Sequence, residues 1–172
     1  HAGRSMKHKL QDIRRHLAAV EHVPQVEAEE AGGGGGDVAL LSSSLDEVAY
    51  IYNIRGTDIP YCTVALAYSM ITKENAFLFI DANKLDSHVL SELQAAGVDV
   101  RPYDEVKEKV AQHIHSSGSS GSSRKIWMDS HATSSAIFHS VPAARRIVRP
   151  SPVSLMKACK NSAEQSGMRT CH

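Results

Sequence analysis

One stretch, residues 39–58 with the sequence ALLSSSLDEVAYIYNIRGTD, limits the possible folds of this chain more than any other. Its first residues follow Val38 and are apolar, as expected of a buried strand. Ser44 and Glu47 then form a capping-box pattern, in which each side chain accepts a hydrogen bond from the backbone amide of the other residue. Apolar residues at helical spacing follow, and Gly56 is free to adopt a positive φ in the turn that ends the helix. The stretch therefore predicts a strand, a capped helix and a tight turn, in that order.

The rest of the chain alternates between the patterns of strands and helices. Further strands are predicted at residues 64–72, 75–81, 98–101, 125–128 and 146–148. Further helices are predicted at residues 7–21 and 133–139. Two more are predicted to begin after the N-cap residues Asp86 and Asp104. Gly97 is expected to be the left-handed residue that ends the helix after Asp86. Residues 73 and 74 join two strands as a hairpin turn, so one pair at least is antiparallel. We expect an α/β fold in which one mixed sheet is flanked by helices.

Three separate blocks of the sequence resemble one protein family, in the family's own order. They are SLDEVAYIYNIRGTDIPY at residues 44–61, FLFIDANKL at 77–85 and SLMKACKNSAEQSGMRTCH at 154–172. Together they are similar to the second, creatinase-like N-terminal domain of three-domain Xaa-Pro aminopeptidases (aminopeptidase P, metallopeptidase family M24) and to the junction that leads into their catalytic domain. The resemblance implies the creatinase/prolidase N-terminal fold, which is a ribonuclease-H-like mixed sheet.

We expect the chain to divide into three segments. Residues 1–36 are predicted to form an N-terminal helix and a flexible Gly-rich linker, because the five consecutive glycines precede a strand, whereas those of a phosphate-binding loop follow one. Residues 37–153 are the predicted creatinase-like domain, with a low-complexity Ser/Gly loop at 116–123. The resemblance makes residues 154–172 the start of a connection to a catalytic domain that is missing here, so we expect a fragment of a longer protein.

Charge and cysteine content argue against several classes of function. Lys plus Arg is 19 and Asp plus Glu is 19, so the chain has no basic surplus with which to bind nucleic acid. No apolar run approaches the roughly 20 residues that a membrane-spanning helix requires. Three widely spaced cysteines fit neither a disulfide framework nor a structural zinc site and favour a reducing compartment. We expect a cytoplasmic protein, with an organelle as the alternative if a transit peptide has been removed.

The resemblance places the family's chemistry outside this chain. In the family, two divalent metal ions, typically manganese, are held by two Asp, one His and two Glu of the C-terminal domain, where they activate water and polarise the scissile carbonyl. None of those motifs occurs here, so no catalytic residue or metal ligand is predicted, and the chain alone is expected to be inactive. We expect His113 and His115 at the surface or at a helix end, with a bound metal as the alternative. Cys62 is a candidate reactive thiol only if a base or a helix N-terminus lies near it.

Arg55 and Asp58 are the one polar pair that we single out as a candidate site. They flank Gly56 on the predicted turn, and a positioned guanidinium suits carboxylate partners. One interpretation gives the pair a contact in a substrate channel or with a neighbouring domain. In the other interpretation the two side chains pair with each other within the turn or brace it.

The resemblance implies a non-catalytic middle domain of a Xaa-Pro aminopeptidase. Such a parent removes the N-terminal residue from peptides with proline in second position, where the tertiary amide blocks ordinary aminopeptidases. The expected partners are a C-terminal pita-bread catalytic domain, a preceding N-terminal domain, and proline-containing peptides that bind through the parent, which the resemblance allows to be a homodimer. The alternative is a stand-alone creatinase-like module that binds other proteins and has no peptidase activity.

Overall fold

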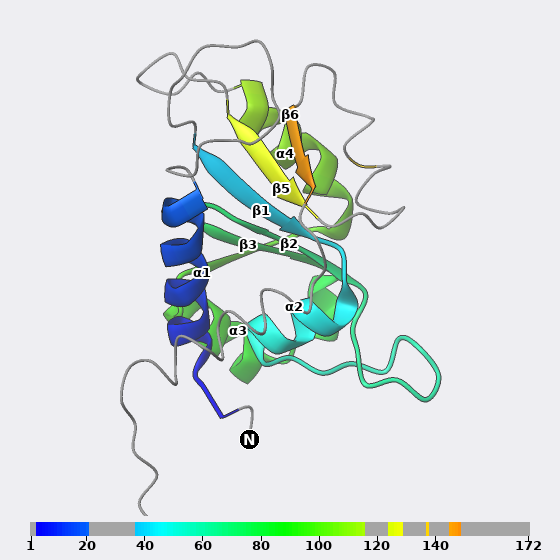
Figure 1. Cartoon of the computed structure of the whole chain (residues 1–172). Helices are drawn as coiled ribbons and strands as arrows, with labels where there is room; N and C mark the ends of the chain where they lie inside the picture. Colours follow the sequence, from blue (N-terminus) through cyan, green and yellow to red (C-terminus); the bar gives the residue numbers. More distant parts are fainter. Residues whose placement is uncertain (1–2, 21–36, 116–123, 129–136, 138–144, 149–172) are drawn as a thin grey trace, which may run out of the picture.

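The computed structural model describes residues 3–20, 37–115, 124–128, 137 and 145–148 (Figure 1). The helices and strands, in chain order, are α1 (Met6–Val20), β1 (Val38–Ser42), α2 (Leu45–Tyr52), β2 (Ala67–Ile71), β3 (Ala76–Ile80), α3 (Ser87–Ala95), β4 (Val98–Arg101), α4 (Val106–His115), β5 (Lys125–Met128) and β6 (Arg145–Val148). These bounds confirm, to within a few residues, the strands and helices that apolar spacing predicts in this part of the chain. The predicted Gly-rich linker, Ser/Gly loop and C-terminal connection lie outside the described residues, and so does most of the predicted helix at 133–139.

The strands form one mixed sheet in the order β4-β3-β2-β1-β5-β6. β2 is antiparallel to both of its neighbours, β1 and β3, whereas the other neighbouring pairs are parallel. In the turn between β2 and β3, the amide of Thr72 donates to the carbonyl of Asn75 at 2.9 Å, and the amide of Asn75 donates to Oγ1 of Thr72 at 2.9 Å. The threonine side chain thus stabilises a two-residue turn that lacks the usual glycine. The predicted mixed sheet and its hairpin are confirmed.

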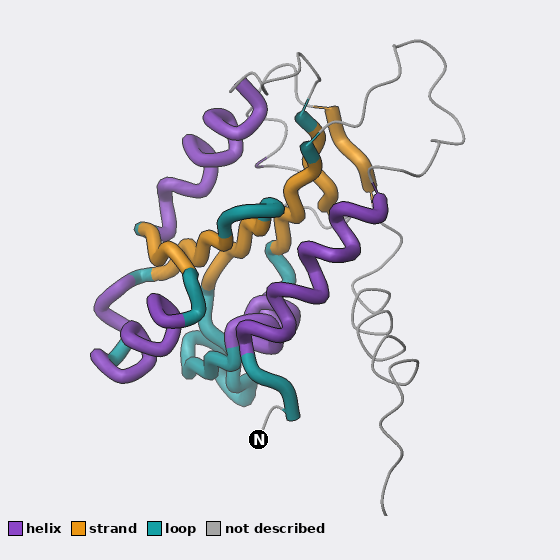
Figure 2. Tube along the Cα trace, turned by 90° about the vertical axis from the view of Figure 1, so that its left-hand side faces the viewer, coloured by secondary structure: helices purple, strands orange, loops and turns teal. Residues whose placement is uncertain are grey.

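Helices cover both faces of the sheet (Figures 1 and 2). Successive residues of a strand point to opposite faces. In β1, Leu40 therefore packs in the core that contains residues of α1, α2 and α3, whereas Leu41 packs in the core that contains residues of α4. Leu78 and Phe79 of β3 are divided between the two cores in the same way. Every residue of β1 and β3 is buried, as expected for strands that are covered on both sides.

α1 places an apolar stripe on one face of the sheet. Leu10, Ile13 and Leu17 are at most 2% exposed and share a core with β1, because spacings of three and four bring them to one side of the helix. Arg14 ties the helix to the hairpin by donating to the carbonyl of Glu74 at 3.1 Å. α1 therefore lies against the sheet. The boundaries of the three expected segments, 1–36, 37–153 and 154–172, stay predictions.

The helix ends confirm some of the predicted caps and contradict others. Asp86 caps α3 with its side chain, and Gly97 follows that helix with a φ of +75°. The capping box at the start of α2 is wrong, because Ser44 is the N-cap residue but its side chain makes no capping hydrogen bond. Glu47 turns into the core instead, where Oγ of Ser42 donates to its Oε2 at 2.6 Å. A buried hydroxyl needs a partner, and this carboxylate provides one.

Asp104 does not cap α4 either. A short 3-10 helix, Tyr103–Glu105, contains Asp104 and continues directly into α4. The buried face of α4 is nevertheless as predicted, since Val106 and Val110 belong to the core on that side of the sheet.

Candidate functional site

The turn that follows α2 carries the residues singled out in the sequence. α2 ends at Tyr52, and its C-cap residue is Asn53, whose φ of +55° is left-handed. Asparagine tolerates this conformation better than most residues. Gly56 does not adopt the positive φ that the sequence allows. Glycine is required there because a Cβ at position 56 would lie 2.8 Å from the Cβ of Ala65 and 2.9 Å from its Cα. The turn and the segment that leads into β2 therefore approach each other more closely than a side chain allows.

Arg55 is held by the end of α2. Its side chain is exposed, and its Nη1 donates to the carbonyl oxygens of Ile54 at 2.9 Å and Ala49 at 3.3 Å. The last carbonyls of a helix lack partners within the helix, and a cation suits this end of the helix dipole. Arg55 thus stabilises the end of α2 and keeps part of its guanidinium at the surface.

Asp58 is held by two partners that sequence reasoning missed. Its Oδ2 accepts from Nζ of Lys84 at 2.9 Å and from the amide of Leu66 at 2.7 Å. The hydrogen bond from Lys84, together with that from Leu66, holds the pKa of Asp58 below its usual value. Lys84 lies in the FLFIDANKL block of the sequence, but nothing in that block alone indicates its partner. Asp58 therefore connects the loop after α2 with the segment that follows β3.

Arg55 and Asp58 line the same pocket, although they have separate partners. The pocket has a volume of about 570 Å³ and lies between the turn and the segment that joins β3 to α3. Its other lining residues are Asn53, Ile54, Gly56, Thr57, Ala65, Ile80, Lys84, Leu85, Asp86 and Val89. Apolar side chains with a few charged groups around them suit a peptide segment or the surface of another domain.

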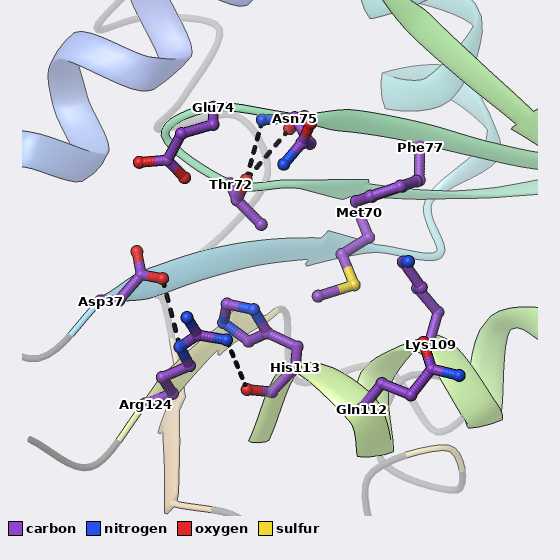
Figure 3. A pocket seen from close by; sticks show the side chains of 10 residues that line it. All are labelled: Asp37, Met70, Thr72, Glu74, Asn75, Phe77, Lys109, Gln112, His113 and Arg124. Atoms are coloured by element: carbon purple, nitrogen blue, oxygen red, sulfur yellow. Dashed lines mark hydrogen bonds and ion pairs between the residues drawn. The ribbon is translucent and has the colours of Figure 1, made fainter. Parts of the chain in front are cut away.

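A second, smaller pocket lies between α4 and the sheet (Figure 3). Its volume is about 190 Å³. Nε of Arg124 lies 3.4 Å from Oδ2 of Asp37, and Nη1 of Arg124 donates to the carbonyl of His113 at 3.3 Å. Nε2 of His113 and Oδ1 of Asp37 are buried there and have no hydrogen-bond partner among the residues that the structure describes. Such atoms normally bind ordered water, for which this pocket has room.

The structure places His113 at one of the two expected positions. It lies at the end of α4, as expected, but it is 8% exposed and so does not lie at the surface. Burial lowers the pKa of His113, and the nearby charge of Asp37 opposes this effect. The sequence did hold a signal, since a residue three positions after the buried Val110 lies on the same side of a helix. His115 is exposed, as expected, and Cys62 is exposed as well.

Neither pocket offers a metal centre. Within the part of the chain that the structure describes, no group of three or more His, Cys, Asp or Glu side chains could hold a metal ion. No helix in the described ranges is long and apolar enough to cross a membrane. What the described residues provide is a charged turn beside a pocket that apolar, polar and charged side chains line together.

The fold defines a mixed α/β domain with one sheet flanked by helices, and comparison with known proteins identifies its family. Residues 1–164 match the Creatinase/Prolidase N-terminal domain, and the chain belongs to this family. It is 33% identical over 190 residues to "Aminopeptidase P1" of Arabidopsis thaliana, a match that covers 99% of this chain and 27% of that protein. It is 40% identical over 144 residues to "Probable Xaa-Pro aminopeptidase P" of Tuber melanosporum, which covers 77% of this chain and 23% of that protein.

A solved structure shares the fold. The chain superposes with a TM-score of 0.72 on an X-prolyl aminopeptidase from Caenorhabditis elegans, which is described as a cytosolic enzyme with a di-nuclear active site. The match covers 88% of this chain and 22% of that chain, at 24% sequence identity. The chain thus spans about a quarter of the length of the relatives that it matches.

Proposed function

We propose that this chain is the non-catalytic middle domain of a Xaa-Pro aminopeptidase. The parent removes the N-terminal residue from peptides with proline in second position, with two metal ions, expected to be manganese, in a C-terminal domain. The observation that carries the proposal is that named Xaa-Pro aminopeptidases match nearly the whole chain with only about a quarter of their own length.

The role of the domain in this proposal is architectural. It separates a preceding N-terminal domain from the pita-bread catalytic domain and shapes the access of short peptides to the active site. In this proposal, Arg55 and Asp58 provide polar groups on the surface of the domain that lies next to the substrate channel or the neighbouring domain. The geometry supports this role for the two residues, because both line one pocket and Asp58 accepts hydrogen bonds from both Leu66 and Lys84.

The location and assembly of the parent are proposed from its relatives. The relative from Caenorhabditis elegans is described as cytosolic, and we propose the cytoplasm for this protein, with an organelle as the alternative. A homodimeric parent is proposed from the family resemblance.

Peptide hydrolysis tests the proposed function. The purified chain, residues 1–172, is compared with the longer polypeptide that continues past His172, each with manganese and an Arg-Pro-Pro peptide. We expect only the longer polypeptide to release arginine, and a chelator to abolish the release. Hydrolysis by residues 1–172 alone, lost on chelation, would contradict the claim that this chain lacks the metal site. An inactive longer polypeptide would favour a stand-alone interaction module.

The roles of Arg55 and Asp58 need a separate test within the longer polypeptide. Arg55→Ala and Asp58→Asn are expected to raise KM for the peptide several-fold while kcat changes little. Arg101→Ala is the matched control, because Arg101 is a partly exposed arginine on β4 that pairs with Asp99 at 2.8 Å. Equal kinetics in all three variants would leave Arg55 and Asp58 with structural roles alone.

A further inference from the structure

The loop between α2 and β2 extends away from the sheet and its helices (Figure 1). At its tip, residues 59–62, the amide of Cys62 donates to the carbonyl of Ile59 at 3.1 Å. Pro60 is second in this four-residue turn, and Tyr61, with a φ of +61°, is third. This is the pattern of a type II turn, whose third position requires a positive φ and is normally glycine. A tyrosine at this position strains the backbone.

Tyr61 gains no burial in the described part of the domain that would offset this strain. The side chain of Tyr61 is fully exposed, and Ile59 and Leu66 of the same loop are exposed as well. Among the described residues, the one other exposed large apolar side chain is Tyr103, which stacks on Tyr68 with ring centroids 4.8 Å apart. Exposed apolar side chains that gather on one loop mark an interaction surface.

The base of this loop is firmly held. Asp58 fixes it through the amide of Leu66 and the side chain of Lys84, and Gly56 lies directly against Ala65. Because the folded domain already holds the base of the loop in place, the tip loses little conformational entropy when it binds a partner.

We propose that the tip, residues 59–62, is a docking element that places the ring of Tyr61 in an apolar surface of the remaining part of the longer polypeptide. This inference rests on the proposed function. The tip carries no charged residue, so the surface that it fits is apolar and offers an acceptor to the phenol group. The chain spans about a quarter of its relatives' length, so most of such a parent lies outside it and is available to cover the tip.

A tethered partner explains why so small an element suffices. A stable contact between separate proteins buries about 800 Å² on each partner, which is more than a four-residue tip provides. Within one polypeptide the effective concentration of the two surfaces is high, so a smaller contact is enough. These areas favour a domain of the same polypeptide over a second copy.

The exposed thiol of Cys62 reports on whether the tip is covered. Its alkylation rate is followed by mass spectrometry of the peptide that contains it, in residues 1–172 and in the longer polypeptide. We expect alkylation to be at least tenfold slower in the longer polypeptide, and Tyr61→Gly to restore the fast rate there. In residues 1–172, Tyr61→Gly is expected to raise the denaturant midpoint, because glycine relieves the backbone strain.

Lys107→Cys on α4 is the matched control, since Lys107 is exposed on the other side of the sheet; its alkylation rate should be similar in both polypeptides. Equal rates at Cys62 in the two polypeptides would overturn the docking proposal, and so would protection in residues 1–172 that grows with concentration, which would identify a second copy as the partner. Peptide hydrolysis is scored separately. Slow Cys62 alkylation in a longer polypeptide without peptidase activity would contradict the proposed function and leave the docking element standing.

Discussion

Nζ of Lys9, in α1, donates to the carbonyl of Tyr50 near the end of α2, at a distance of 2.5 Å. It also donates to Oδ1 of Asn53 and lies 4.0 Å from the centroid of the Tyr50 ring. A lysine of α1 thereby donates to one of the last backbone carbonyl groups of α2, which have no hydrogen-bond donor within their own helix. Lys9 is 1% exposed, and burial, with smaller effects of Arg55 and Arg4, lowers its pKa to about 8.

This lowered pKa predicts how stability depends on pH. The ordinary pKa of lysine, about 10.4, applies in the unfolded chain, so between pH 8 and 10 the unfolded chain binds more protons than the folded one. The free energy of unfolding should therefore rise with pH in this window, by about 1 kcal/mol between pH 8 and 9.5 after allowance for solvent screening. Urea unfolding at several pH values in this window measures the rise.

Lys9→Met should remove this rise, because methionine fills a similar volume without a titratable group. Lys7→Met, at an exposed position of the same helix, should keep it. A rise of the same size in both variants would show that another group is responsible.

Gly56→Ala should destabilise the domain by about 1–3 kcal/mol, because the new Cβ meets Ala65 backbone and side-chain atoms at 3.0 Å or less. The denaturant midpoint measures the loss. Ala65→Gly in the same chain should recover part of it, since it removes the nearest contact but leaves the Cα and the amide nitrogen of residue 65. Gly97→Ala is the comparison: it meets nothing within 4 Å and is strained by its positive φ alone. A Gly56→Ala variant with wild-type stability would contradict the close approach.

The sequence was sufficient for the elements and the fold because these depend on local patterns. The spacing of Leu10, Ile13 and Leu17 predicts α1, and Asp86 with Gly97 brackets α3 as the structure has it. The family resemblance added the creatinase/prolidase N-terminal fold, which periodicity alone does not give.

The sequence was not sufficient where a polar side chain depends on a distant partner. A lysine on an amphipathic helix normally indicates the solvent side, yet Lys9 is buried by residues 41 and 44 positions further along the chain. Lys84, the partner of Asp58, is 26 positions away from it. Arg55 and Asp58 were found from their turn, but only the assembled fold brings them to one pocket.

Tyr52→Phe should destabilise the domain by about 1–2 kcal/mol. The hydroxyl of Tyr52 is buried, donates to the carbonyl of Phe77 at 3.1 Å and lies 2.8 Å from Oγ of Ser69. Burial raises the pKa of Tyr52, so the phenol stays neutral and keeps both partners at physiological pH. A double-mutant cycle with Ser69→Ala should show a coupling free energy of at least about 0.5 kcal/mol. Tyr61→Phe, at a fully exposed ring, should leave the stability unchanged; equal losses in the two variants would argue against the buried network.

The start of α2 offers a direct comparison between the pattern in the sequence and the contact in the structure. If Ser44 capped the helix through its side chain, Ser44→Ala would cost about 1 kcal/mol. The side chain makes no such bond, so we expect a loss below about 0.5 kcal/mol. Ser42→Ala should cost about 1–3 kcal/mol, because it removes the 2.6 Å hydrogen bond to a carboxylate that is 2% exposed.

Both variants replace a serine by an alanine and so remove one hydroxyl group, which makes each the matched control for the other. Chemical denaturation of the two proteins under one set of conditions gives the difference between their free energies of unfolding. A larger loss in Ser44→Ala than in Ser42→Ala would restore the capping box and contradict the buried position of Glu47. The expected order instead means that Glu47 anchors the start of α2 to the end of β1, and so sets the direction in which α2 and the turn after it leave the sheet.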